Sequence, residues 1–277
     1  RVRLPFLANR LNYRNHRKII IIDGTVGFTG GINISDRYIN SPNTTPYWRD
    51  TYLMLQGLSA LALQRVFLSD WNFCSNEPLT VNAHYFPLDQ PINEPPIYTQ
   101  IVSGGPDSDL PNILFTLNSA IQSAQDEILL ATPYFIPDAT LQENLILAAL
   151  SGIKVKLLLP EKSDSKTVDL ASRSYFDELL QAGVEIYLYT KGFLHSKTFV
   201  IDRKIASVGT ANLDLRSFDL NFEVTTLIYH QDIAVGMAGR FYEDLKDARQ
   251  LSNEQWQSRS KLTRFTERIV RLISPLM

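Results

Sequence analysis

The sequence predicts an α/β protein that contains a duplicated unit. Its 277 residues include 44% hydrophobic and 20% charged side chains, a composition typical of globular proteins. Short β-branched runs alternate with helical patterns, which favours an α/β over an all-β architecture. A stretch from His16 and a stretch from His195 both fit the pattern H-x-K-x4-D-x6-G-(G/T)-x-N. Two copies in the same register indicate a repeated structural unit.

Strands are expected where short runs of β-branched or other apolar residues occur, and helices where apolar residues recur at helical spacing. In chain order, the expected strands cover 18–22, 128–131, 155–159, 184–189 and 198–201. The expected helices cover about 109–125, 139–151 and 166–182. The Gly-containing turn after each motif is expected to end a second strand. A further helix should follow each copy, because Phe67 and Asp70 match Phe241 and Asp244.

The last expected helix lies within 251–277 and is basic and amphipathic. Lys261, Arg264, Arg268 and Arg271 recur at helical spacing, and Leu262, Phe265, Ile269 and Leu272 form the adjoining stripe. Two interpretations stay open. Either the apolar stripe packs on the preceding domain while the charges face water, or the charged stripe also faces an anionic bilayer.

The chain divides into two unequal halves. Residues 1–74 form the C-terminal part of the first half, and residues 98–277 form the second half. The segment 75–97 connects them, because it shows no clear period and contains Pro78, Pro87, Pro91, Pro95 and Pro96. Only fifteen residues precede His16, whereas about a hundred separate Ile97 from His195. The first half is therefore expected to be N-terminally truncated.

Composition excludes several classes of function. With 27 basic and 29 acidic side chains, the formal net charge of -2 gives no bulk attraction for nucleic acid. A single cysteine, Cys74, excludes an intrachain disulfide and a cysteine-based metal site. Apolar runs such as 19–22 and 145–150 are too short to span a bilayer. No metal-ligand cluster is recognisable, so neither a metal nor another cofactor is expected.

The duplicated motif places groups suited to phosphate chemistry on one face. Because side chains alternate along a strand, the His and Lys of H-x-K point into the same space. The candidates are His16, Lys18 and Asn33 in the first copy and His195, Lys197 and Asn212 in the second. The lysines and asparagines can bind an anionic oxygen. One histidine can attack phosphorus to give a phosphohistidine while the other moves a proton.

Four carboxylates accompany these groups. Asp50 and Glu223 occupy equivalent positions after the motifs, and each is expected to accept a hydrogen bond from the Nδ1–H of the histidine in its own copy. Asp23 and Asp202 complete the motif and are grouped with its catalytic residues. Their place at strand ends favours anchoring of lysine or backbone groups over proton transfer.

These residues carry a resemblance to the phospholipase D superfamily, whose signature is the duplicated H-x-K-x4-D motif. The chain is most similar to its bacterial cardiolipin synthase family. The similarity extends over nearly the whole chain, through NYRNHRKIIIIDG, TGGINISDRY, YWRDT, SGGPD, TPYFIPD, LLLPEKSDS, HSKTFVID, VGTANLDLRSFDLNFE and LISPLM. The motif is highly specific for the superfamily, whereas SGGPD and TPYFIPD point more weakly to the synthases.

The resemblance implies two pseudo-symmetric halves, each a mixed sheet flanked by helices, that share one active site. It implies condensation of two phosphatidylglycerol molecules to cardiolipin and glycerol, with His16 as nucleophile and His195 as general acid and base. It also implies an anionic membrane surface as partner, and anchoring on the cytoplasmic side of the bacterial inner membrane by segments absent from this chain. The alternatives are a phospholipase D-type hydrolase, another phosphatidyltransferase, or an inactive fragment. The oligomeric state stays open.

Overall fold

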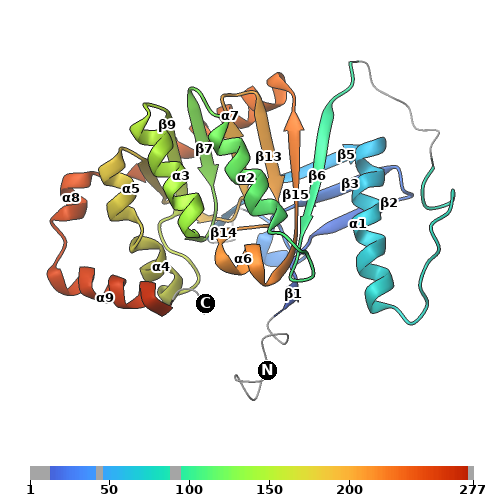
Figure 1. Cartoon of the computed structure of the whole chain (residues 1–277), viewed down its shortest axis with the longest axis horizontal. Coiled ribbons are helices and arrows are strands. Elements are labelled where there is room, and N and C mark those ends of the chain that lie inside the picture. Colours follow the sequence, from blue (N-terminus) through green and yellow to red (C-terminus); the bar gives the residue numbers. More distant parts are fainter. Residues whose placement is uncertain (1–12, 42–45, 88–94, 274–277) are drawn as a thin grey trace.

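The second half is built around a nine-stranded mixed sheet, to which the first half contributes one short edge strand (Figure 1). The computed structural model describes residues 13–41, 46–87 and 95–273, so the parts of the expected segments that fall on 1–12, 42–45, 88–94 and 274–277 lie outside the described residues. The strand order is β1-β15-β13-β12-β7-β9-β10-β16, and β6 also pairs with β15. The strands are β1 (Arg14–Asn15), β6 (Tyr98–Gly104), β7 (Glu127–Ala131), β9 (Lys154–Pro160), β10 (Glu185–Tyr189), β12 (Thr198–Ile201), β13 (Ile205–Gly209), β15 (Asn221–Tyr229) and β16 (Ala248–Gln250).

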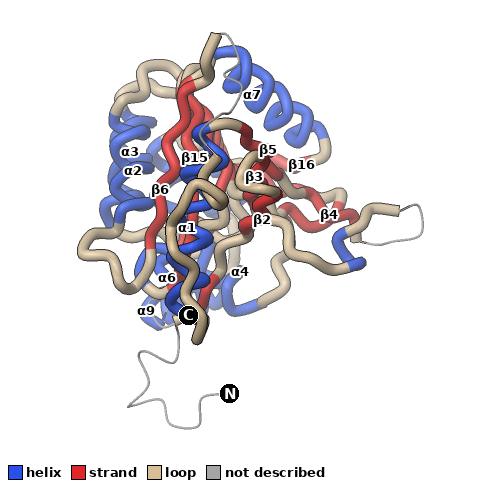
Figure 2. Tube along the Cα trace, turned by 90° about the vertical axis from the view of Figure 1, so that its right-hand side faces the viewer, coloured by secondary structure: helices blue, strands red, loops and turns tan. Residues whose placement is uncertain are grey.

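Helices cover both faces of this sheet (Figure 2). One face carries α2 (Asn112–Gln122), α3 (Ala139–Leu150), α4 (Lys166–Arg173) and α5 (Phe176–Ala182) over the main apolar core. The other face carries α7 (Gln231–Lys246), whose Ala234, Ala238 and Phe241 pack against Leu129 and Val200 of the strands. Apolar residues on both sides keep the central strands β7 and β9 out of water.

The first half contains a smaller antiparallel sheet of three strands. Its order is β2 (Ile19–Ile22), β3 (Val26–Gly30) and β5 (Tyr52–Gln56), and α1 (Leu58–Cys74) packs against it. Leu55 and Leu63 of this half meet Val224 of β15 in a small shared core. The two halves therefore pack on each other through their sheets.

Two short strands of the first half pair with strands of the second. β1 runs parallel to β15, with Arg14 opposite Asn221 and Asn15 opposite Phe222. β4 (Tyr47–Arg49) runs parallel to β11 (Gly192–Leu194). These pairings carry the residues next to His16 and His195 across the boundary between the halves. The remaining strands, β8 (Phe135–Ile136) and β14 (Leu213–Asp214), pair with each other.

The α/β class and the strands expected from sequence are confirmed to within one or two residues. The expected helix at 166–182 is wrong as a single element, because it is divided into α4 and α5 at Ser174 and Tyr175. The Ser174 hydroxyl donates to the carbonyl of Ala171, and the Tyr175 ring packs edge-on against Phe135 in the core. The described residues also form α6 (Leu215–Asp219), α8 (Asn253–Gln257) and a short 3-10 helix (Asp36–Tyr38).

The basic amphipathic helix is confirmed as α9 (Lys261–Ile273), but its expected orientation is wrong. The apolar stripe of Leu262, Phe265, Ile269 and Leu272 is exposed and does not pack on the second half. Arg264 and Arg271 instead face α5, where they pair with Asp177 and Glu178. Within the described ranges, no helix combines the length and apolar character needed to cross a membrane.

Candidate active site

The two motif histidines are held in equivalent ways by the opposite half. The backbone N–H of His16 donates to the carbonyl of Phe222 at 3.0 Å, and that of His195 donates to the carbonyl of Arg49 at 2.7 Å. Phe222 and Arg49 directly precede Glu223 and Asp50. Each histidine backbone is thus fixed beside a carboxylate of the other half, which explains why β1 and β4 cross between the sheets.

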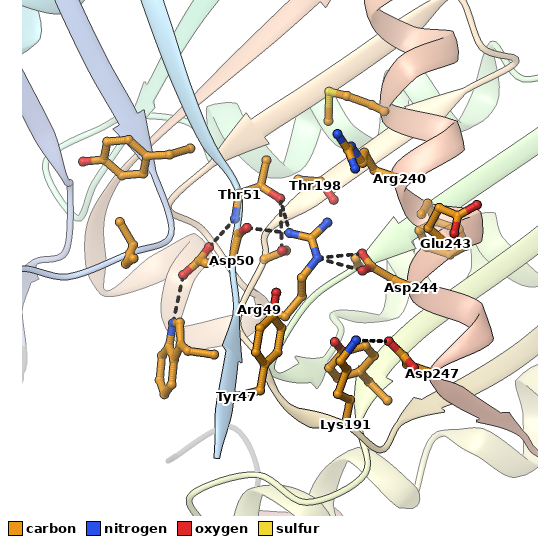
Figure 3. Close-up of a pocket in the computed structure, with 18 of the residues that line it drawn as sticks. Tyr47, Arg49, Asp50, Thr51, Lys191, Thr198, Arg240, Glu243, Asp244 and Asp247 are labelled. Atoms are coloured by element: carbon orange, nitrogen blue, oxygen red, sulfur yellow. Dashed lines mark hydrogen bonds and ion pairs between the residues drawn. The ribbon is translucent and has the colours of Figure 1, made fainter. Parts of the chain in front are cut away.

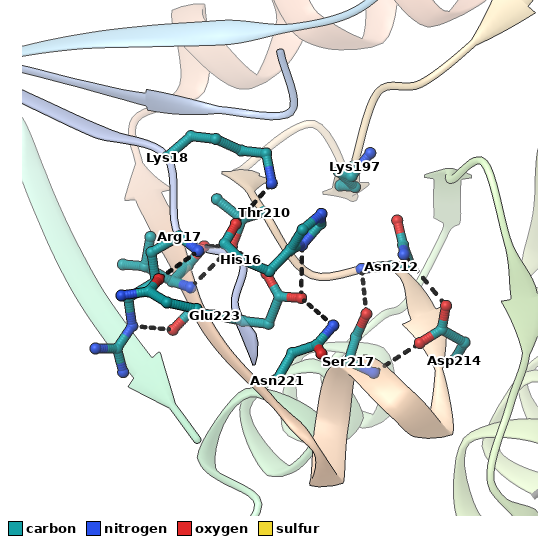
Figure 4. A network of polar contacts seen from close by, with 12 residues as sticks. His16, Arg17, Lys18, Lys197, Thr210, Asn212, Asp214, Ser217, Asn221 and Glu223 are labelled. Carbon is teal, nitrogen blue, oxygen red and sulfur yellow. Dashed lines mark hydrogen bonds and ion pairs between the residues drawn. The ribbon is translucent and has the colours of Figure 1, made fainter. Parts of the chain in front are cut away.

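The histidine side chains follow the same crossed pattern, and Figure 4 shows its first pair, His16 with Glu223. His16 Nδ1 lies 2.8 and 3.0 Å from the carboxylate oxygens of Glu223, and His195 Nδ1 lies 2.8 Å from Asp50 Oδ2. The expectation that each carboxylate serves the histidine of its own copy is therefore wrong. A carboxylate that accepts from Nδ1–H leaves Nε2 as the free nitrogen of the ring.

The two lysines occupy matching positions beside the histidines. Lys18 Nζ donates to the His16 carbonyl at 2.6 Å, and Lys197 Nζ donates to the His195 carbonyl at 2.7 Å. Both lysines lie close to Glu223 and Asp50, and the negative charges of these carboxylates act to raise the lysine pKa values. One carbonyl uses one N–H of each ammonium, so two donors on each remain for an anionic ligand.

Burial weakens the basicity of this cluster. It lowers the pKa of Lys18 to about 8 and that of Lys197 to about 7. Burial, reinforced by the positive charge of Lys197, lowers the pKa of His195 to about 4 against the opposing hydrogen bond with Asp50. In the free protein at neutral pH, His195 is therefore neutral, and Lys197 loses its charge far below the pH at which an ordinary lysine does. A bound phosphodiester anion would favour the protonated form of all three groups.

The two motif asparagines are not equivalent. Asn212 is buried, and its Nδ2 donates to Asp214 Oδ2 at 3.2 Å while its backbone N–H donates to the Ser217 hydroxyl. Its Oδ1 is buried without a hydrogen-bond partner among the described residues. Asn33 is exposed, and among the described residues its side chain reaches the Tyr38 hydroxyl, at 3.4 Å. The structure therefore presents one ordered carboxamide at the centre and one at its rim.

Asp23 and Asp202 lie at the far ends of the strands that begin at the lysines. Asp202 is the fifth residue after Lys197, and five steps along an extended chain span about 16 Å. The Asp202 carboxylate accepts hydrogen bonds from the backbone N–H groups of Gln125, Asp126 and Glu127. Asp202 therefore anchors the start of β7, as its position at a strand end suggested, and its grouping with the catalytic residues is not supported by its contacts.

The side chains of Glu223 and Asp50 differ in length, and the residue beside each carboxylate differs accordingly. The Thr210 hydroxyl donates to Glu223 Oε2, and the Asn221 side chain donates to Glu223 Oε1 at 3.1 Å. The residue equivalent to Thr210 is Gly31, where an added Cβ would clash with Asp50 Oδ1. A hydroxyl thus supports the longer carboxylate, and a missing side chain makes room beside the shorter one.

Sequence reasoning missed two arginines that flank the centre. Arg17 pairs with Asp70 at 2.5 Å and donates to the carbonyls of Glu223 and Gly104. Arg49 pairs with Asp244 at 2.7 Å and donates to the carbonyl of Asp50. The available signal was the equivalence of Asp70 and Asp244, together with an arginine beside a motif residue on each side.

Arg49 and Asp244 line a charged pocket of ≈ 660 Å³ behind Asp50 (Figure 3).

Beside the same centre, Trp48 contacts the rings of His195, Phe193 and Tyr38 at centroid distances of 4.5 to 4.9 Å. These rings help to leave the His195 side chain 9% exposed, whereas that of His16 is 30% exposed. Of the two rings, His16 is therefore the one that a ligand reaches more easily.

No group of three or more histidine, cysteine, aspartate or glutamate side chains that could hold a metal occurs within the described part of the chain. The centre combines two imidazoles, two buried ammonium groups and one ordered carboxamide. That set can bind an anionic tetrahedral group and move protons on opposite sides of it.

Comparison with known proteins gives a consistent result. Residues 117–245 match the family described as "Cardiolipin synthase, PLD-like domain". The chain is 46% identical over 276 residues to the cardiolipin synthase of Geobacillus sp. (strain WCH70), covering 100% of this chain and 55% of that protein. It is 47% identical, with the same coverage, to that of Geobacillus kaustophilus (strain HTA426). The chain thus spans about half the length of these curated relatives.

Among solved structures, the phosphatidylserine synthase of Haemophilus influenzae Rd KW20 has a similar fold. The TM-score is 0.69 at 17% sequence identity, and the match covers 98% of this chain and 73% of that one. At that sequence identity, the likeness is evidence of a shared fold alone.

Proposed function

Because this chain belongs to the phospholipase D superfamily, we propose that its crossed histidine centre is the active site of a cardiolipin synthase-like phosphatidyltransferase. The observation that carries the proposal is the pairing of each motif histidine with a buried carboxylate of the opposite half, at 2.8 Å in both cases. Two histidines held in this way, with a lysine beside each, provide the two proton positions and the anion site that phosphatidyl transfer requires.

In the first step, His16 Nε2 attacks the phosphorus of one phosphatidylglycerol. A P–N bond forms, the P–O bond to the glycerol headgroup breaks, and the other histidine gives its proton to the departing glycerol oxygen. Lys18, Lys197 and Asn212 bind the non-bridging oxygens as negative charge develops. Glu223 holds the tautomer of His16 that presents Nε2.

In the second step, the terminal glycerol hydroxyl of another phosphatidylglycerol attacks the phosphohistidine. His195 takes the hydroxyl proton, the P–N bond breaks, and cardiolipin forms. His195 therefore ends each cycle protonated and ready to release the next glycerol. Its low pKa in the free protein is raised by the charge of the bound phosphodiester, so protonation accompanies substrate binding.

We place the reaction at the bacterial cell membrane, where phosphatidylglycerol resides. A hydrolase would share the first step and use water in the second. The products distinguish the two: cardiolipin and glycerol for the synthase, phosphatidic acid and glycerol for the hydrolase. Transfer to another alcohol would identify a different phosphatidyltransferase, and no product would identify an inactive fragment.

The first prediction concerns the covalent intermediate. With a substrate labelled in its phosphatidyl group and carrying p-nitrophenol, a leaving group that needs no proton, the His195→Asn variant should accumulate label on His16, because only the second step then lacks its base. The His16→Asn variant should show no label, and both variants should lose at least about 100-fold in rate. Acid-quenched protein and peptide mass spectrometry give the measurement.

The exposed His84 provides the matched control, and His84→Asn should keep the full rate. Label retained only in the His16→Asn variant would reverse the roles of the two histidines. Label in neither variant, with wild-type turnover intact, would contradict the phosphohistidine mechanism.

A further inference from the structure

The helix α9 carries its apolar side outward. Leu262, Phe265, Ile269 and Leu272 follow one another at spacings of three, four and three residues, so they share one face of the helix. They are 74%, 60%, 46% and 81% exposed. We call these four residues the outer stripe. Four large apolar side chains left in water on a single helix indicate a surface that is covered when the protein works.

The inner side of α9 is fixed by ion pairs. Arg259, just before the helix, pairs with Glu267 at 2.7 Å and with Asp177 at 3.2 Å, and Glu267 is 3% exposed. Arg271 pairs with Glu178 at 2.9 Å and lies over the ring of Tyr175. Because these contacts hold the helix against α4 and α5, the helix cannot rotate to bury the outer stripe without breaking them.

Two basic residues lie next to the outer stripe. Lys261 and Arg268 are exposed and form no ion pair with another residue of the described chain. Each precedes a stripe residue, Phe265 or Leu272, by four positions, so on the helix surface it is that residue's direct neighbour. The outward surface of α9 therefore combines an apolar stripe with cations along one side.

We propose that this surface of α9 docks on an anionic phospholipid bilayer. The apolar side chains would enter the boundary between headgroups and acyl chains, and Lys261 and Arg268 would lie among the lipid phosphates. In Figure 1, α9 lies along the same edge of the molecule as β1 and α6, which adjoin His16 and Asn212. Docking would bring that edge toward the lipid. The choice of an anionic lipid rests in part on the proposed function.

Binding to vesicles tests the proposal with the full chain. Vesicles of phosphatidylglycerol and phosphatidylcholine are floated in a density gradient with the protein, at low and high salt. Phe265→Ser combined with Leu272→Ser should weaken binding at least about tenfold at either salt concentration. Lys261→Gln combined with Arg268→Gln should weaken it about fivefold for each cation at low salt, with little effect at high salt.

Leu147→Ser combined with Leu150→Ser is the matched control, because these leucines are 60% and 67% exposed on a different helix, α3. This variant should bind as the wild type does. Equal loss in the control, or unchanged binding of the Phe265 and Leu272 variant, would overturn the proposal. So would a dimer in solution that the Phe265 and Leu272 variant converts to monomer, since the stripe would then bind a second copy.

Turnover of a short-chain, soluble phosphatidylglycerol separates this inference from the proposed function. The α9 variants should keep that turnover while losing vesicle binding. Wild-type protein that binds vesicles but does not turn over the soluble substrate would contradict the proposed function and leave the docking surface in place.

Discussion

The two motif lysines show how burial sets the working range of the proposed site. An exposed lysine keeps its charge up to a pH of about 10.4, but burial brings the pKa of Lys197 to about 7 and that of Lys18 to about 8. In the free protein these groups therefore lose their charge only slightly above neutral pH. A phosphodiester approaching an uncharged lysine gains far less than one approaching an ammonium group.

We accordingly predict an early alkaline fall in kcat/KM, which reports groups of the free protein. With a soluble substrate, kcat/KM should fall between about pH 7 and 8, well below the range of an ordinary lysine. Lys197→Arg should move the fall to higher pH, because a guanidinium stays protonated. A fall that begins only near pH 10 would contradict the lowered lysine pKa values.

Stability should change in the opposite direction over the same range. When a base has a lower pKa in the folded state, the unfolded chain binds more protons between the folded value and the ordinary one. For Lys18 and Lys197 that interval begins at about 8 and 7. These two groups therefore make the folded state more stable as the pH rises through the interval, while binding of an anion weakens.

At this scale the sequence predicted the identities of the central residues better than their contacts. Equal register of the two motifs was enough to identify His16, Lys18, His195 and Lys197. It could not reveal that Glu223 serves His16, because the distance between two halves depends on packing and not on spacing within one copy. The first copy has Gly31 where the second copy has Thr210, and this difference can be explained only when the neighbouring carboxylate is known.

Among the elements, the turns after the two motif strands have the same backbone conformation but make different contacts. Asp23 and Asp202 both adopt a φ of 51°, in the left-handed region that an aspartate tolerates better than most residues. Burial alone would raise the pKa of Asp202, but the hydrogen bonds from the backbone of Glu127, Asp126 and Gln125 outweigh it and lower that pKa. Asp23 makes no hydrogen bond with another described residue.

We predict that Asp202→Ala lowers the free energy of unfolding by about 2 to 3 kcal/mol, because three backbone N–H groups lose a charged acceptor. Asp23→Ala is the matched control for the loss of an aspartate at the same backbone conformation, and its effect should be below about 1 kcal/mol. Urea unfolding measures both. Since the folded-state pKa of Asp202 is lowered, its contribution is present above its ordinary value and disappears as the pH falls. Equal losses in the two variants would show that the turn itself, and not the anchoring of β7, is responsible.

The sequence predicted the elements well where a single pattern decides them, as in β12, whose bounds match the expected strand. It failed where tertiary packing decides. The orientation of α9 could not be read from its periodicity, since an apolar stripe and a basic stripe side by side allow either to face inward. Glu267, Asp177 and Glu178 settle the matter, and two of these three lie far away in sequence.

For the molecule as a whole, the duplication predicted two related halves but not the degree to which they interlock. β1 and β4 of the first half each pair with a strand of the second, and the histidine backbones bond across the same boundary. Arg17 and Arg49 reinforce this on the two sides of the centre. Both arginines belong to the first half, yet they stand at different motif positions, so the pseudo-symmetry is kept in space rather than in sequence.

The last prediction concerns the ion pair between Arg49 and Asp244, which joins the first half to α7 of the second. Its partners are 18% and 16% exposed, and Arg49 also donates to the carbonyl of Asp50. Removing either partner leaves a largely buried charge, so Arg49→Met and Asp244→Asn should each cost about 3 kcal/mol of unfolding free energy. The double variant should cost much less than their sum, which gives a coupling energy of about 2 kcal/mol in urea unfolding.

Lys191 and Asp247 provide the control cycle, because they line the same pocket but are 52% and 41% exposed. Solvent screens such a pair, and the Lys191→Met and Asp247→Asn effects should be small and additive. If Arg49 and Asp244 also proved additive, the pair would not join the halves. If the coupling is found, Asp244→Asn should lower kcat more than it raises KM, because Arg49 then holds Asp50 less firmly and Asp50 no longer fixes the tautomer of His195. Asp244 reaches His195 only through Arg49 and Asp50. Such a loss of rate would therefore link the stability of the interface to the chemistry between the halves.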